Sequence, residues 1–278
     1  MSNNSLSALL EKLESVQVTL GWGAVFAFSR ERVNRMLEQQ FTAAFNAYRF
    51  IKPFSGELDT VKLSGIVFGA PVMSFENADL HNSTATVRIP LLAGRYDELE
   101  RTPGRSVSGL RRHDIERADG AVLALQIDLQ QVNSDSDNTG RVAINLRLAR
   151  EPLCTLAADP ALQQEIGEHL LEHLRKEPAN KTTFVLALVN AGNYTPLNPV
   201  QFMIRTQPAP GAREAGARNA GDGAILVYMK VQAYPLEPEG EPGADYPYLI
   251  PDDADSGEAL YSAALYVHRD LTPFVNEA

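Results

Sequence analysis

The stretch SRERVNRMLEQQFTAAFNAY, residues 29–48, decides the fold of this chain. Its apolar residues recur at the three- and four-residue spacing of a helix with one apolar face: Val33, Met36, Leu37, Phe41, Ala44, Phe45 and Tyr48. Ser29 can cap the first turn with its hydroxyl, and Pro53 ends the pattern. The pattern predicts an amphipathic helix over about residues 30–50, roughly 30 Å long at about 1.5 Å per residue.

The apolar face of this helix is too large to stay in water. Burying one such side chain stabilises a protein by about 1.5–3 kcal/mol, so six of them contribute about 10–15 kcal/mol. We therefore expect the helix to be wrapped by sheet.

After the helix, the spacing of apolar residues changes from 3.6 to 2, which indicates strands with one buried face, the habit of antiparallel sheets. Eight strands are predicted at residues 61–68, 84–90, 122–132, 141–150, 183–190, 200–207, 225–234 and 260–269. Two shorter β-like runs precede the helix at 16–20 and 25–28.

The clearest strand pair is a β-hairpin around the turn-forming residues 133–140. Its first strand would place four apolar residues opposite those of the second: Leu123, Leu125, Ile127 and Leu129 against Val142, Ile144, Leu146 and Leu148.

Two further helices are expected, one over 5–14 and one over 160–176, closed by Pro178. Residues 208–223 and 235–258 are rich in proline and glycine, which predicts long loops. The strands on both sides of these loops need each other, so residues 1–278 are expected to form a single module. The predicted fold class is α+β, mainly antiparallel β, with a sheet around one long helix and a second, shorter helix.

Composition limits the function. The net charge of −10 argues against nucleic acid, which requires clustered Lys and Arg. A single cysteine, Cys154, excludes an intrachain disulfide. The N-terminus lacks the basic start and apolar run of a signal peptide, and no run of residues is apolar enough for a transmembrane span. We expect synthesis in the cytosol, with export by another route left open.

The sharpest chemical motif is HLLEH, residues 169–173, which fits the pattern of one class of zinc peptidases. Two imidazoles one helical turn apart would bind zinc, with Glu172 as the base. A third ligand should come from another helix, but the downstream glutamates lie in loop-like sequence. The sequence favours an ordinary amphipathic helix whose histidines pack against a sheet, and no metal is expected.

The other motifs also fail in detail. The segment that begins at Asp135 starts like a calcium loop, but Leu146 occupies the twelfth position, where a glutamate is required. Gly21-Trp22-Gly23 lacks the third glycine of a dinucleotide fingerprint. Cys154 has apolar neighbours, which predicts a buried and inert thiol. We expect no catalytic residue and no cofactor.

The order of elements is similar to that of a known family. The run GWGAVFAFS (21–29), followed by Val33-Asn34 and the long helix, resembles the start of a tubular lipid-binding (TULIP) module. More narrowly, it resembles the OrfX-type proteins encoded beside clostridial neurotoxins. Four further pieces carry this resemblance: LSGIVFGAP (63–71), VRIPLLAG (87–94), LNPVQF (197–202) and LYSAALY (260–266).

The resemblance implies a long helix inside a strongly curved antiparallel sheet, with lipid held between the two. The ligand side of the helix would then be Val33, Met36, Leu37, Phe41 and Phe45, facing the strand residues Leu125, Ile127 and Ile144. The family offers no catalytic residues. Its members often contain two modules, so this chain could also be the N-terminal module of a longer protein.

Two functional hypotheses follow. The first is a non-enzymatic module that binds a lipid or another apolar ligand as an accessory of a bacterial toxin system. The second is an interaction subunit with a filled, ligand-free core, which docks a toxin component or a sister TULIP-like subunit through loops such as 208–223 and 235–258. Composition alone cannot separate a slot from a filled core.

Overall fold

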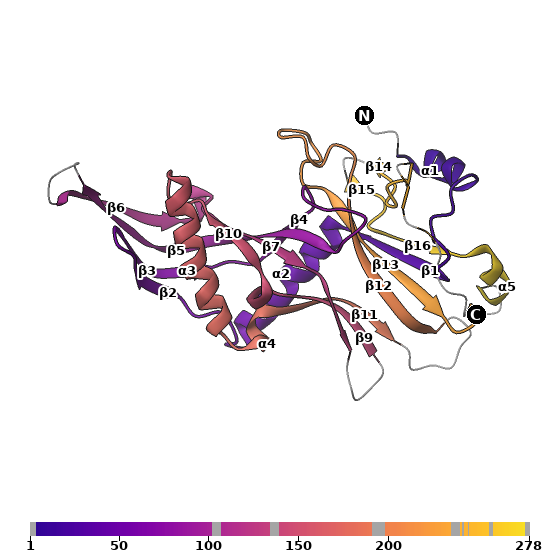
Figure 1. Cartoon of the computed structure of the whole chain (residues 1–278), viewed down its shortest axis with the longest axis horizontal. Helices are drawn as coiled ribbons and strands as arrows, with labels where there is room; N and C mark the ends of the chain where they lie inside the picture. Colours follow the sequence, from indigo (N-terminus) through magenta and orange to yellow (C-terminus); the bar gives the residue numbers. More distant parts are fainter. Residues whose placement is uncertain are drawn as a thin grey trace.

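The computed structural model describes residues 4–101, 107–133, 139–190, 198–234, 240, 242–243, 245–255 and 258–275. The fold is mostly antiparallel β, with a strongly curled, half-barrel sheet and few helices (Figure 1). The helices are α1 (Leu6–Leu13), α2 (Arg30–Asn46), α3 (Pro160–Lys176), α4 (Ala179–Thr182) and α5 (Thr272–Val275). The strands are β1 (Ala24–Ser29), β2 (Phe54–Glu57), β3 (Val61–Phe68), β4 (Val72–Ser74), β5 (Thr84–Arg101), β6 (Val107–Glu116), β7 (Val122–Asp128), β8 (Gln130–Asn133), β9 (Thr139–Asn145), β10 (Arg150–Cys154), β11 (Thr183–Asn190), β12 (Pro199–Pro208), β13 (Gly223–Val231), β14 (Ala254–Asp255), β15 (Glu258–Ala259) and β16 (Ala263–Val267).

The largest sheet is built around β5, a strand of 18 residues. Its order is β10-β7-β5-β3-β2, and β4 and β6 also pair with β5. The first half of β5 pairs with β7 and β4, and its second half pairs with β6 and β3. The β5–β6 hairpin projects from the body of the molecule, at the far left of Figure 1. One face of this sheet is covered by α3, which packs on β10, β7 and β2.

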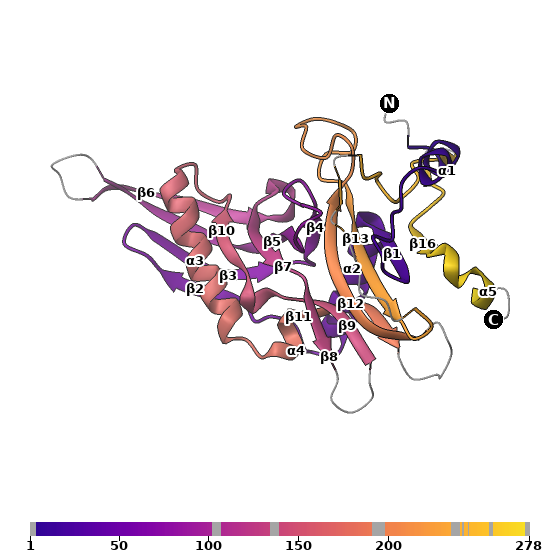
Figure 2. The ribbon, with the colours of Figure 1, turned by 45° about the vertical axis from the view of Figure 1, so that its right-hand side comes forward.

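A smaller sheet of order β12-β13-β1-β16 forms the other end of the molecule, and a three-stranded sheet of order β11-β9-β8 lies below (Figure 2). Helix α2 packs between them, in contact with β1, β13, β4 and β11. The main hydrophobic core contains buried residues from both larger sheets together with α2 and α3. A second core lies on the opposite face of the small sheet, under α1 and residues 246–250.

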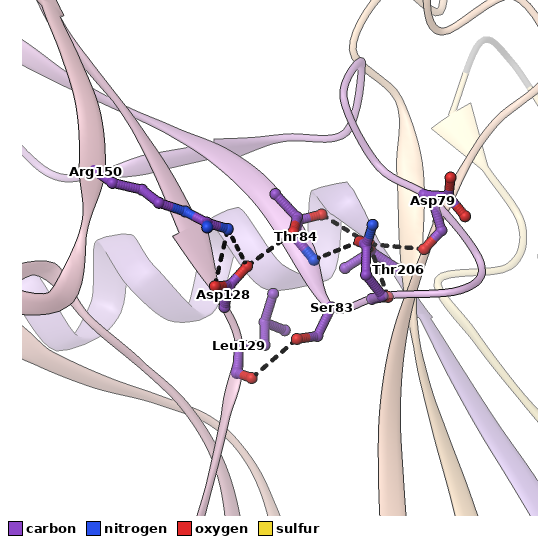
Figure 3. Close-up of polar contacts among 8 residues, drawn as sticks. Asp79, Ser83, Thr84, Asp128, Leu129, Arg150 and Thr206 are labelled. Atoms are coloured by element: carbon purple, nitrogen blue, oxygen red, sulfur yellow. Dashed lines mark hydrogen bonds and ion pairs between the residues drawn. The ribbon is translucent and has the colours of Figure 1, made fainter.

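A polar seam joins the small sheet to the large one (Figure 3). The Thr206 hydroxyl on β12 donates a hydrogen bond to the Thr84 carbonyl at the start of β5, at 2.7 Å. The Thr84 hydroxyl in turn donates to Asp128 at 2.8 Å, and Arg150 binds both oxygens of this carboxylate at 2.8 and 2.9 Å. The seam lies where the chain leaves β7 and starts β8.

The seam explains a wrong prediction. Residues 123–129 were expected to pair with 142–148, but β7 pairs with β5 and β10 instead. The chain changes sheets at Leu129, whose N–H donates to the Ser83 carbonyl at 3.0 Å. The hairpin then forms one step later between β8 and β9, with Gln130 opposite Ala143, and residues 146–148 form a short 3₁₀ turn. Residues 134–138, where the sequence predicts the middle of the hairpin turn and the start of the calcium-like segment, lie outside the described residues.

Most of the other predicted elements are confirmed, with shifted ends. The run at 16–20 is wrong, because these residues form turns and not a strand. Among the described residues, six strands are not predicted by the sequence: β2, β4, β6, β10 and the two-residue strands β14 and β15. β6 has the sequence VSGLRRHDIE, so its charged residues hide the alternation of a strand.

The long helix is shorter and less covered than expected. It ends at Asn46, and its buried residues are Val33 and Leu37. Phe45 is 56 % exposed and Tyr48, beyond the helix end, is 88 % exposed. The expectation that sheet covers the whole apolar face is therefore wrong at the C-terminal end, where the neighbouring strands do not reach.

Candidate functional site

Helix α2 is fixed most firmly at its N-terminus. The Ser29 hydroxyl accepts a hydrogen bond from the Arg32 N–H at 3.4 Å, as the sequence predicts. Arg30 donates to the Ala220 carbonyl at 2.9 Å and forms an ion pair with Asp222 at 3.2 Å. This end of the helix is thus tied to the loop between β12 and β13.

Two side-chain amides tie the helix to strand edges. Asn34 accepts from the Met73 N–H on β4 at 2.7 Å and donates to the Met73 carbonyl at 3.2 Å. Gln40 accepts from the Val185 N–H on β11 at 2.9 Å and donates to the Val185 carbonyl at 2.7 Å. Each amide therefore satisfies both backbone groups of one strand residue, as a neighbouring strand would. These amide clamps hold α2 between the large sheet and the three-stranded sheet.

The residues predicted to hold a ligand are largely brought together. Five of them belong to the main core and are at most 1 % exposed: Val33, Leu37, Leu125, Ile127 and Ile144. Met36 and Phe41 are half-buried and pack against this core. Phe45 is apart, on the surface, where its ring lies 5.3 Å from that of Phe50. The site is thus a packed core with half-buried residues at its margin.

Sequence reasoning missed an apolar strip on the small sheet. Phe26 on β1 and Met229 on β13 are half-buried and pack against the main core. Leu265 on β16 lies directly opposite Phe26, so both side chains are on the same face, and Leu265 is 59 % exposed. We call these three residues the open strip. A signal was present in the alternation of AVFAFS, but the partner strand of β1 could not be read from the sequence.

The predicted histidine motif lines an open cleft of about 500 Å³ between β2 and α3. The His173 Nε2 lies 2.8 Å from the Lys52 carbonyl, and its ring stacks on Phe68 and tilts against Phe54. Glu172 forms an ion pair with Lys176 at 2.8 Å; the hydrogen bond and the charge of Lys176 lower the pKa of Glu172. His173 therefore packs against the sheet, as the sequence favours.

The same cleft gives no support to a zinc site. Within the described ranges, no three His, Cys, Asp or Glu side chains are placed to hold a metal ion. Cys154 is fully buried, as the sequence predicts, and burial raises the pKa of its thiol to about 11.

A second cleft of about 500 Å³ is polar and is lined by Glu76, Asn77, Gln126 and Arg213. Arg213 donates to the Ala78 carbonyl at 2.8 Å, so part of the predicted loop 208–223 is docked on the chain itself. Burial alone would raise the pKa of Glu76, but the hydrogen bond from Ser74 and the charge of Arg88 together lower it. The charges lining this cleft thus already have partners within the chain.

The other predicted loop is also partly docked. Gln207 donates to the Pro247 carbonyl at 2.8 Å and accepts from the Leu249 N–H at 3.1 Å. Leu249 is fully buried in the second core. Residues 245–250 thus form a strap over the outer face of the small sheet and not a free surface.

Comparison with known proteins points to one fold. No protein-family model and no curated protein matches the sequence. The structure is similar to that of P47 of Clostridium botulinum E1, with a TM-score of 0.55 and 12 % identity, over 91 % of this chain and 53 % of that one. The chain shares the fold of P47. It spans about half the length of that protein.

Two solved structures are similar with lower TM-scores. P47 from Clostridium botulinum A2 has a TM-score of 0.48 and 16 % identity, over 77 % of this chain and 45 % of that one. A lipopolysaccharide binding protein has a TM-score of 0.25 and 10 % identity, over 81 % of this chain and 55 % of that one. Neither is close enough to support an argument. Among the described residues, no helix combines the length and the apolar character needed to cross a bilayer.

Proposed function

We propose that this chain is a non-enzymatic module that binds a lipid or another apolar ligand, as an accessory of a bacterial toxin system. The observation that carries the proposal is the open strip of Phe26, Met229 and Leu265, where the main core meets solvent on the side of α2. Apolar residues left half-buried beside a core are what an adaptable apolar site requires. The toxin connection rests on the resemblance to the OrfX-type proteins and on the fold shared with P47.

In this proposal the predicted site residues divide into two groups. The fully buried Val33, Leu37, Leu125, Ile127 and Ile144 form the floor. The half-buried Met36 and Phe41, with the open strip, are the groups that move aside for an acyl chain, because they lie at the margin of the core and are already partly in solvent. Phe45 takes no part, since it is exposed at the far end of the helix. The sheet then wraps the ligand and the helix together.

The proposal is tested by native mass spectrometry of the purified chain, followed by organic extraction. We expect an added hydrophobic mass that extraction recovers. With stripped protein, a fluorescent fatty acid should bind saturably, and Leu265→Asp should weaken this binding about ten-fold, which corresponds to about 1.4 kcal/mol. Leu110→Asp is the matched control, because Leu110 is similarly exposed, at 54 %, but lies on the projecting β6. The proposal would be contradicted if the spectrum showed only the mass of the ligand-free chain and the fatty acid did not bind saturably.

The alternative is an interaction subunit with a filled core. The nearly complete burial of the core residues around Leu37 favours it, as does the length of P47, about twice that of this chain. A second P47-like module would then be the natural partner. Size-exclusion chromatography with light scattering would detect a dimer of this chain, and a ligand-free monomer that captures no neighbouring toxin-cluster protein would count against this alternative.

A further inference from the structure

The turn that ends α2 carries an exposed tyrosine in a position that usually belongs to glycine. The Tyr48 N–H donates to the Phe45 carbonyl at 3.0 Å, and the Arg49 N–H donates to the Ala44 carbonyl at 2.8 Å. These two bonds form a Schellman motif, in which the residue after the cap adopts a left-handed conformation. Tyr48 occupies that position, with φ of 55°.

Folding does not account for this tyrosine. A residue with a Cβ is strained in the left-handed region, where glycine is free. A buried ring could compensate by packing, but Tyr48 is 88 % exposed. The strained backbone of the exposed Tyr48 therefore suggests a functional role for this residue.

The neighbours of Tyr48 give this surface its chemistry. Phe45 is also exposed, and its ring lies 5.3 Å from that of Phe50. Arg49 lies between Tyr48 and Phe50, Lys52 follows two residues after Phe50, and both cations are exposed. In the part of the chain that the structure describes, neither cation forms an ion pair with a carboxylate. We call Phe45, Tyr48, Arg49, Phe50 and Lys52 the basic aromatic turn.

The turn is held firmly at its base. Ile51 is only 8 % exposed, and the Lys52 carbonyl lies 2.8 Å from the His173 Nε2 on α3. In Figure 1 the C-terminal end of α2 lies toward the lower edge of the body of the molecule. The aromatic rings and the two cations are thus presented on a rigid support at an edge.

We propose that the basic aromatic turn docks the protein on an anionic lipid bilayer. Aromatic side chains favour the water–lipid interface, and Lys and Arg beside them bind lipid phosphates. A chain of net charge −10 is repelled by such a surface unless it approaches through a positive spot, which this turn provides. A protein partner fits less well, because stable interfaces bury roughly 800 Å² on each side, from about 20–30 residues.

This docking goes beyond the proposed function, since it involves neither the open strip nor the core residues. A stripped protein without an internal ligand can dock, and a protein that carries a ligand can fail to dock. The two proposals therefore fail separately.

Cosedimentation of the whole chain with vesicles tests the docking. We compare vesicles of phosphatidylcholine alone with vesicles that also contain phosphatidylserine, and we expect binding to the latter. Tyr48→Gly relieves the strain, so its Tm should be equal to or above that of the wild type, while its vesicle binding falls several-fold. This combination separates docking from folding, because a merely structural tyrosine would not produce it.

Charge reversal provides the second arm. R49E/K52E should reduce binding to the anionic vesicles about ten-fold or more, as expected for cations that each contribute to attraction near the surface. Arg269→Glu is a control for reversing one charge elsewhere on the surface: Arg269 is 92 % exposed, lies near the C-terminus and pairs with Asp270 at 3.7 Å, and this variant should bind as the wild type does. Equal binding of Tyr48→Gly and wild type, or equal binding to both kinds of vesicle, would overturn the proposal. So would a wild type that binds neither.

Discussion

The two ends of α2 have the same amphipathic pattern but very different surroundings. At the N-terminal end, Arg30 pairs with Asp222, Asn34 clamps β4, and Val33 is fully buried. At the C-terminal end, Phe45 is 56 % exposed and Tyr48 stands in a strained conformation in solvent. The difference arises from what surrounds the helix: Asn34 binds β4 near its first turns, and Gln40 binds β11 farther along, whereas Phe45 and Tyr48 lie in solvent.

The spacing of apolar residues identifies a helix and its apolar face. It does not show how much of that face other elements cover. An apolar side chain is buried only where another element reaches it. The N-terminal end of α2 is therefore expected to carry the stability of the helix, and the C-terminal end is available for function.

The largest effect should come from truncating the buried residues. Leu37→Ala removes a fully buried side chain from the main core and should destabilise the protein by about 2–5 kcal/mol. Phe45→Ala should cost less than about 1 kcal/mol, because most of that ring is already in water. Urea unfolding measures both values. Equal losses would mean that the two ends of the helix are covered alike.

A smaller effect should come from the amide clamp at the N-terminal end. Asn34→Leu keeps the size of the side chain but leaves the Met73 N–H and carbonyl without their partner, at a cost of about 1–3 kcal/mol. Asn46→Leu is the control on the same helix, since Asn46 is exposed at the last helical position. Hydrogen exchange should locate the loss, with faster exchange of the Met73 amide in Asn34→Leu. Unchanged protection there would show that the clamp is dispensable.

Much of the fold could be predicted from the sequence, because local signals agree with the final structure. Ser29 caps α2 as expected, and the alternation of residues 183–190 and 200–207 gives β11 and β12. The predictions of strand pairing that are wrong depend on contacts between segments that are distant in the sequence. No local pattern shows that the strand of 122–132 changes partners at Leu129, since this depends on Ser83 and Thr84 of another strand.

The candidate site could also be predicted only in part from the sequence. The core residues around Leu37 come together because they are the most apolar positions of strongly periodic segments. The open strip could not be predicted, because Leu265 becomes part of it only when β16 pairs with β1. The sequence predicts that most of the basic aromatic turn belongs to the end of the helix over about residues 30–50. The exposure of this turn depends on the absence of a strand beside it in the described structure.

The smallest expected effect concerns the N-terminal end of α2, and it is an effect on the pH dependence of stability. Glu76 and Arg30 both lie beside Gly221, and Glu76 accepts a hydrogen bond from Ser74 and pairs with Arg88 at 2.8 Å. These contacts lower its pKa in the folded state below the ordinary value of a glutamate. A lowered carboxyl pKa contributes stability that is present above the unfolded value and is lost as pH falls through the folded value. Glu76→Gln should therefore be less stable than the wild type at pH 7, by less than about 1 kcal/mol for a pair that is partly exposed, and the difference should shrink as the pH falls through the lowered pKa of Glu76. Glu38→Gln, with an exposed carboxyl on α2, is the control and should follow the wild-type profile.

Thermal unfolding at intervals between pH 3 and pH 7 measures the stability profiles of the wild type and the two variants. A difference between Glu76→Gln and the wild type that stays constant over this range would show that the charge of Glu76 does not help to anchor the N-terminal end of α2.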